Sequence, residues 1–153
     1  GRAPDYLDGH QHVQLFPQVR NAFLEAAKDA ASGGWVRQCG RVQPFRHGVG
    51  SPKALLLDGL SRQFRRKAAR AGLRFNPGFA GAYDFSGGRD FGVLMRQFLD
   101  GLPDGGLIMC HPGFVDATLR ELDPLTDQRE RELAYLASDD FPALLAATRT
   151  ELR

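Results

Sequence analysis

The 153-residue sequence has no run of about 18 apolar residues, which is the length that a membrane-spanning helix requires. It also has no basic segment followed by an apolar stretch near its start, so no signal peptide is expected. Only two cysteines are present, Cys39 and Cys110, and both are flanked by strand-like residues. Two widely separated thiols favour buried side chains in a reducing compartment over a disulfide framework. We therefore expect a cytoplasmic protein without a membrane span.

A large excess of charge of one sign is also absent. The net charge is +2, with 25% charged and 42% hydrophobic residues, so no global field argues for nucleic acid or a membrane surface. One local basic run, Arg62–Arg70, falls in a helical pattern whose expected buried stripe is Leu56, Leu60, Phe64 and Ala68. A solvated helix face explains this run, and an anionic partner is the alternative.

Short apolar segments alternate with helical patterns along the chain. The expected strands are residues 4–8, 35–39, 73–76 and 105–111, and the expected helices are residues 17–31, 52–72, 89–102, 128–137 and 141–147. Strands that are apolar throughout imply a parallel sheet covered by helices, so the predicted class is α/β with one domain over residues 1–153. Four strand–helix units are half of an eight-unit (β/α) barrel, and an open four-stranded sheet is the alternative.

Two segments place histidines where expected strands end. Asp8, His10 and His12 follow the first strand, and His111 follows the fourth. Because the carboxyl ends of parallel strands share one edge of a sheet, both segments are expected on the same face. If residues 8–12 are extended, His10 and His12 point the same way, which suits one metal or one substrate. Exposed or hydrogen-bonded histidines are the alternative, because His-x-His also occurs by chance.

Two other features carry weaker predictions. His47 lies among loop residues and is expected to be exposed. Cys110 precedes His111, which would suit a cysteine nucleophile with a histidine base. Adjacent side chains of a strand point to opposite faces, however, so this pair is not expected to meet.

The two histidine segments resemble motifs of one enzyme family. "LDGHQHVQLFPQV", residues 7–19, resembles the D-S-H-H-H-V-H-x-x-P segment of the YdjC-like carbohydrate deacetylases. "IMCHPGFVD", residues 108–116, is similar to the later C-H-P-x-F-x-D segment. Residues 74–85 look like the loop between these motifs, and residues 127–138 look like the family's Arg-containing helix. The group includes chitooligosaccharide deacetylases and hopanoid-associated deacetylases.

The sequence also departs from the family pattern. The Asp-Asp-Phe-Gly and Gly-x-His segments do not occur in these 153 residues, and Gln11 and Gln14 replace two histidines. The resemblance therefore implies the second half of a TIM-barrel-like deacetylase. One Asp and one His of the metal site, and the general-base Asp, are expected upstream of Gly1. Residues 1–153 alone are expected to be inactive.

The resemblance implies hydrolysis of the N-acetyl group of an amino sugar or glycolipid with a divalent metal ion, magnesium or zinc. His10 matches a metal ligand and His12 is the second candidate. His111 matches the residue that acts as acid or stabilises the tetrahedral intermediate. Asp8 is a candidate to orient a histidine ring in support of catalysis, and its alternative is a turn residue before Gly9.

Three further residues are candidates for substrate binding. Arg37 ends the second expected strand and either reaches the sugar or forms a structural ion pair. Phe79 and Tyr83 either form a stacking wall for a sugar ring or pack over the edge of the sheet.

The sequence also allows two alternative functions and predicts an oligomeric state. A non-catalytic sugar-binding or interaction domain is the main alternative, and a hydrolase using Cys110 is a weaker one. A half-barrel would leave an open edge, so a homodimer that covers the helix stripes of residues 55–64 and 94–99 is expected.

Overall fold

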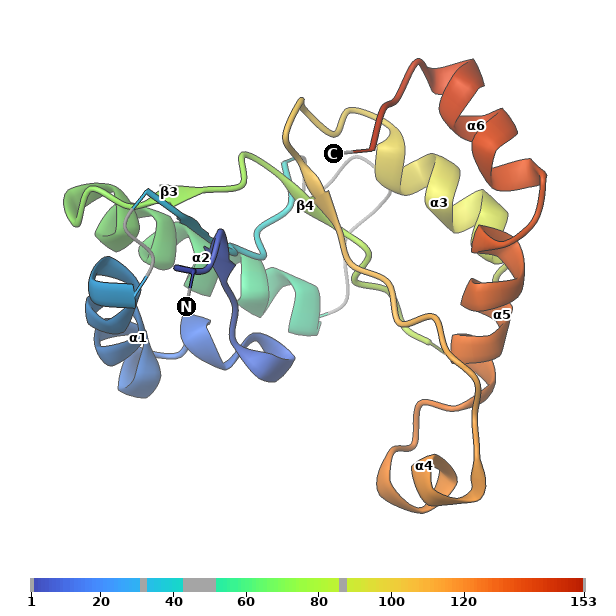
Figure 1. Cartoon of the computed structure of the whole chain (residues 1–153), viewed down its shortest axis with the longest axis horizontal. Helices are drawn as coiled ribbons and strands as arrows, with labels where there is room; N and C mark the ends of the chain where they lie inside the picture. Colours follow the sequence, from blue (N-terminus) through green and yellow to red (C-terminus); the bar gives the residue numbers. More distant parts are fainter. Residues whose placement is uncertain (1, 31–32, 43–51, 86–87, 153) are drawn as a thin grey trace. The chain divides into compact units, whose positions relative to one another are not determined.

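The structure is a computed structural model that describes residues 2–30, 33–42, 52–85 and 88–152 (Figure 1). Two residues that carry predictions lie outside the described residues. They are His47, which is expected to be exposed, and Ser51, which is expected to cap the second helix because it stands directly before Pro52. The contacts divide the chain into two compact units. The first comprises residues 1–80 and 102–107, and the second comprises residues 81–101 and 108–153. The mixed α/β class is confirmed, and the half-barrel stays a prediction.

The first unit contains a three-stranded parallel sheet. Its strands are β1 (Tyr6–Leu7), β2 (Trp35–Val36) and β3 (Arg74–Phe75), in the order β1-β2-β3. Tyr6 pairs with Trp35 and Trp35 with Arg74. The rings of Tyr6 and Trp35 stack at 5.0 Å. The predicted parallel arrangement is therefore confirmed for three of the four expected strands.

Helices pack beside this sheet in the first unit. They are the 3-10 helix η1 (His10–Leu15), α1 (Pro17–Ala30) and α2 (Pro52–Arg70) (Figure 1). α1 and α2 lie against each other, with the rings of Phe23 and Phe64 6.0 Å apart. Pro52 begins α2 as predicted, because a helix leaves its first N–H groups unpaired and proline has none to lose.

The buried stripe of α2 differs from the predicted one. Leu56 is 57% exposed, whereas Leu57, Ser61, Phe64 and Ala68 are buried. The predicted stripe repeated every four residues, a step that drifts about 40° around the helix each time. The observed spacing of four, three and four residues follows the helical period. Among the basic residues of this helix, Arg62, Arg66, Lys67 and Arg70 are exposed, as expected of a solvated face.

The fourth expected strand does not join the first sheet. Residues 105–111 contribute only β5 (Leu107–Ile108), which forms a two-stranded sheet with β4 (Phe79–Ala80). The prediction of one four-stranded sheet is therefore wrong for the described residues. β4 has only two residues, which is too short for an alternating pattern to be recognised in the sequence. Just after it, Gly81 has a φ of +98°, and a Cβ there would lie 2.1 Å from the Met109 carbonyl oxygen. Only glycine permits that close approach.

The second unit is mainly helical. Its helices are α3 (Phe91–Leu99), α4 (Ala117–Leu122), α5 (Asp127–Leu136) and α6 (Asp140–Thr148). α3, α5 and α6 pack around a core of Phe91, Leu94, Met95 and Leu144. α4 was not predicted from the sequence, although Asp116 caps it by accepting a hydrogen bond from Leu119 N–H.

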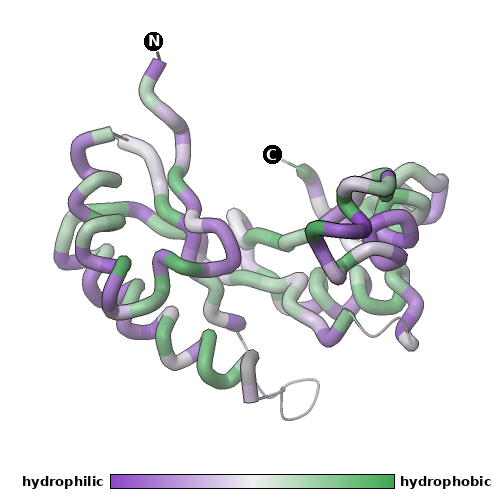
Figure 2. Tube along the Cα trace, turned by 90° about the horizontal axis from the view of Figure 1, so that it is seen from below, coloured by the Kyte–Doolittle hydropathy of each residue, from purple (hydrophilic) through white to green (hydrophobic). Residues whose placement is uncertain are grey.

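Hydropathy follows the helical period in both units. Hydrophilic and hydrophobic residues alternate along the helical coils (Figure 2), as expected of helices that bury one face. Among the described helices, none combines the length and the apolar character needed to cross a membrane.

Candidate functional site

The segment that follows β1 is a tight turn. Residues His10–Leu15 form η1, and Gln11 and His12 have positive φ values of 51° and 65°. His12 N–H donates to Gly9 O at 3.2 Å. The prediction that His10 and His12 lie on one side of an extended segment is therefore wrong. His10 is exposed and His12 is half-buried.

Arg37 is the central side chain of the first unit's polar cluster. It follows β2 and is 6% exposed. Its Nε donates to Asp8 Oδ1 at 2.6 Å, and its Nη2 donates to Gly9 O at 3.2 Å. The structural ion pair considered for Arg37 is present, and contact with a sugar stays a prediction.

His12 contacts two members of this cluster. Its Nδ1 lies 2.9 Å from Arg37 Nη1 and 3.2 Å from Cys39 Sγ. Arg37 Nη1 also donates to Cys39 Sγ at 3.1 Å. Burial raises the pKa of the Cys39 thiol to about 12, a rise that the Arg37 charge opposes. At neutral pH Cys39 is therefore a protonated thiol, and its predicted burial is confirmed.

Gln14 supports the same cluster and was not among the predicted site residues. It is fully buried, and its Nε2 donates to Asp8 Oδ1 at 3.3 Å and to Arg37 O at 3.1 Å. A Cβ on Gly9 would lie 2.5 Å from Gln14 Oε1, so a side chain at Gly9 would disrupt the contact. The signal in the sequence was the glutamine itself, at a position where the family pattern has histidine.

The contacts of Asp8 and Phe79 favour supporting roles. Asp8 Oδ1 accepts from Gly9 N–H at 2.6 Å, which is the turn interaction that was considered for it. Asp8 also accepts a hydrogen bond from Arg37, and Arg37 in turn contacts His12. Phe79 is 1% exposed and lies under the Arg37 guanidinium, 5.5 Å from the ring centroid, so packing describes this ring better than an open sugar-binding wall.

In the second unit, Glu132 organises the segment that contains His111. This α5 residue is fully buried. Its Oε2 accepts from His111 N–H at 2.5 Å, and its Oε1 accepts from Tyr83 O–H at 2.6 Å. Sequence reasoning missed Glu132, because a glutamate in a charged helix suggests a solvated side chain.

Aromatic rings complete the surroundings of His111. The centroids of the Tyr83 and Phe85 rings lie 4.1 Å apart. The Phe85 ring in turn packs edge to face on the His111 imidazole, with 5.3 Å between the two centroids. Burial raises the pKa of the Tyr83 phenol well above its usual value, and the hydrogen bond to Glu132 adds to this shift. Tyr83 is therefore a neutral donor, and its predicted contact with a sugar ring remains a prediction.

Cys110 is part of the apolar packing of the second unit. It lies against the core that contains Leu94 and Met95. Burial raises the pKa of its thiol to about 12, and the Glu132 charge adds to the effect. A nucleophilic cysteine needs a lowered thiol pKa, so this environment is the opposite of a reactive one.

Comparison with known proteins identifies the family. The profile of the YdjC-like protein family matches residues 1–147. The chain belongs to the YdjC-like family. No solved structure matches this chain. The resemblance inferred from the two histidine segments is thereby confirmed, and at the family level it suggests a carbohydrate deacetylase-type hydrolase.

A divalent metal requires several ligands, and the YdjC-like chain supplies few of them in its described part. Among residues 2–30, 33–42, 52–85 and 88–152, no three His, Cys, Asp or Glu side chains gather into a group able to hold a metal ion. His10 is exposed, and its role as a metal ligand stays a prediction. The expectation of further ligands upstream stays a prediction.

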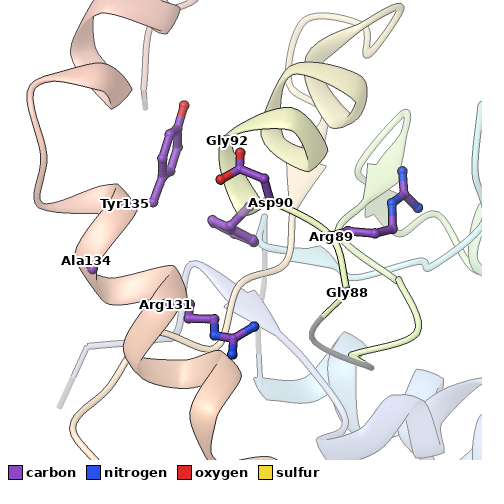
Figure 3. Close-up of a pocket in the computed structure, with 8 residues that line it drawn as sticks. Gly88, Arg89, Asp90, Gly92, Arg131, Ala134 and Tyr135 are labelled. Carbon is purple, nitrogen blue, oxygen red and sulfur yellow. The ribbon is translucent and has the colours of Figure 1, made fainter.

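A pocket of about 400 Å³ lies in the second unit of the YdjC-like chain (Figure 3). Arg89 and Asp90 line it before and at the start of α3, and Arg131 and Tyr135 line it from α5. Asp90 also caps α3 by accepting from Val93 N–H. None of the predicted site residues lines this pocket.

Proposed function

We propose that this YdjC-like chain forms part of a metal-dependent amidase-type hydrolase that removes N-acetyl groups from amino sugars, free or within a glycolipid. The observation that carries the proposal is the family match, which spans both histidine segments. We place the reaction in the cytoplasm because Cys39 and Cys110 are free thiols, as is usual in a reducing compartment.

The amide of an N-acetyl group is a poor electrophile with a poor leaving group. A bound magnesium or zinc ion would polarise the carbonyl and lower the pKa of a bound water. We assign His10 as the ligand from the described residues, because its imidazole is exposed. The remaining ligands and the general base are proposed to come from outside the described residues.

We assign His111 as the acid that protonates the departing amine, or as a donor to the tetrahedral intermediate. Two contacts support this role. Glu132 fixes the main chain of His111 through the N–H group, and Phe85 packs edge to face on its ring. A catalytic acid must be held in place, and these contacts restrict both the backbone and the imidazole.

The substrate-binding roles rest on fewer contacts. Tyr83 is half-buried rather than buried, so it remains the candidate to meet a sugar ring. Arg37 is occupied by Asp8 and its neighbours, so we assign it to positioning within the site.

The test is release of acetate from a panel of N-acetylated sugars by an active preparation of the protein, with and without added metal. Metal-dependent release is expected. His111→Ala should lower turnover by about 10²–10⁴-fold with metal content retained, whereas His10→Ala should lose metal. Binding of a sugar without acetate release would favour the non-catalytic sugar-binding alternative.

A homodimer is part of the proposal. Leu55 and Leu56, in one of the helix stripes expected at an interface, and Val93, just before the other, are exposed apolar side chains. Sedimentation at several concentrations tests it: association should increase with concentration, and Leu56→Lys should weaken it. A strict monomer at high micromolar concentration would contradict it.

A further inference from the structure

The surroundings of His12 differ from those of a metal-binding histidine. A histidine that binds a metal through one ring nitrogen almost always donates the hydrogen of its other ring nitrogen to a carboxylate, a carbonyl or water. Nδ1 of His12 instead faces Nη1 of Arg37 at 2.9 Å and the protonated Cys39 thiol at 3.2 Å. A guanidinium has five N–H donors and no acceptor, so Nδ1 is the acceptor in this contact.

This contact fixes the tautomer of the imidazole. A neutral histidine carries one ring hydrogen, and with Nδ1 accepting from Arg37 that hydrogen is on Nε2. A doubly protonated ring would direct an N–H group at the Arg37 guanidinium. Neither ring nitrogen then has a lone pair for a metal, because Nδ1 uses its pair and Nε2 is protonated.

Arg37 is itself held firmly. Its Nε donates to Asp8 Oδ1 at 2.6 Å, its Nη2 donates to Gly9 O at 3.2 Å, and its guanidinium lies 5.5 Å over the centroid of the Phe79 ring. The Arg37 side chain is 7% exposed, so water cannot readily replace these partners. The Asp8 carboxylate therefore holds the Arg37 guanidinium in place, and the guanidinium in turn holds the His12 imidazole.

We infer that His12 is a neutral hydrogen-bond donor through Nε2, that Arg37 is its positioning residue, and that His12 is not a metal ligand. The inference rests on the proposed function for the identity of the acceptor, a substrate oxygen that gains negative charge as the amide is attacked. A donor aimed at such an oxygen stabilises the intermediate. His10, two residues earlier and exposed, keeps its assignment as the ligand.

The hydrogen position can be measured on the chain without any sugar. Long-range ¹H–¹⁵N correlation spectra report which ring nitrogen carries the hydrogen, and His12→Gln assigns the His12 signals. We expect the hydrogen on Nε2 in the unmodified chain and a mixture of tautomers in Arg37→Met. Arg41→Met is the matched control, because Arg41 pairs with Asp58 in the same unit, and it should leave the His12 signals unchanged.

Arg37→Lys covers the case in which Arg37→Met fails to fold. A lysine ammonium is also a donor without an acceptor, so the hydrogen should stay on Nε2. A hydrogen on Nδ1 in the unmodified chain would overturn the inference.

Zinc provides a second readout. Added zinc should perturb the His10 signals and leave the Nε2 hydrogen of His12 in place. Loss of that hydrogen on zinc addition, with His12 bound to the ion, would overturn the inference. In an active preparation, His12→Gln should lower kcat by about 10²–10³-fold at constant metal content. If no N-acetylated sugar is hydrolysed while the tautomer is as expected, the proposed function and the substrate acceptor of His12 fail. The Nε2 hydrogen of His12 and its exclusion as a metal ligand then stand.

Discussion

The two units of this chain each bury one charged side chain beside a histidine segment, and the two charges have opposite signs. In the first unit Arg37 contacts the imidazole of His12 and the carboxylate of Asp8. In the second unit Glu132 accepts from the main-chain N–H of His111 and from the Tyr83 hydroxyl. The cation therefore sets the protonation pattern of an imidazole ring, whereas the anion sets the path of the backbone.

The compensation of the buried charge also differs between the two units. Arg37 is paired with an oppositely charged carboxylate, Asp8, which keeps partial contact with water. Glu132 is fully buried, and its two carboxylate oxygens receive neutral donors. Because buried polar groups are costly to leave unpaired, Glu132 should be the more sensitive of the two positions.

The largest expected effect is that of Glu132→Leu. This change leaves the His111 N–H and the Tyr83 hydroxyl without their acceptor, and each unsatisfied buried donor costs about 1–3 kcal/mol. The free energy of unfolding should fall by about 4 kcal/mol in urea denaturation. Glu130→Leu on the same helix is the control, because Glu130 is exposed. Equal losses from the two variants would show that Glu132 has no special structural role.

Arg37→Met should have the next largest effect on stability. It removes a buried guanidinium and leaves Asp8 without its partner, at a cost of about 3 kcal/mol. Arg2→Met also breaks an ion pair with an aspartate, but the Arg2 side chain is 82% exposed, so the loss there should stay below about 1 kcal/mol. Urea unfolding of both variants measures the difference. A loss at Arg37 as small as that at Arg2 would contradict a central role for the guanidinium.

The Tyr83 phenol in the second unit should make the stability of the folded chain fall at alkaline pH. The pKa of Tyr83 is raised in the folded chain, so the folded state favours the neutral phenol. The corresponding stability is present below the usual tyrosine pKa of about 10 and is lost as the pH rises towards the folded value. As the pH rises from about 8 to about 11, the free energy of unfolding should fall more in the unmodified chain than in Tyr83→Phe, as urea denaturation at each pH would measure. The same pH dependence in both proteins would exclude Tyr83 as its source.

The smallest expected effect concerns the thiols. Both cysteines have a raised pKa, so both should react slowly with a thiol reagent at neutral pH, Cys39 more slowly because it is the more buried. Reaction of both should become rapid in denaturant. Cys110→Ala should leave acetate release unchanged. A large loss of release with normal folding would revive the cysteine hydrolase alternative.

Local sequence determined much of the secondary structure and the family. Pro52 begins α2, and Asp90 caps α3 through Val93 N–H, three residues away. These contacts form within one helical turn, so neighbouring residues are enough to predict them. The two histidine segments were enough to identify the YdjC-like family, because the order and spacing of motifs can be compared directly in the amino-acid sequence.

Tertiary structure decided the contacts that give each site residue its surroundings. Arg37 reaches Asp8 across 29 residues of sequence, and Glu132 reaches His111 N–H across 21. His12, which has a positive φ, and the buried Gln14 both contact the same Arg37. A pattern of neighbouring residues does not determine which distant group completes a hydrogen bond, because that depends on which segments the packed fold brings within about 3 Å.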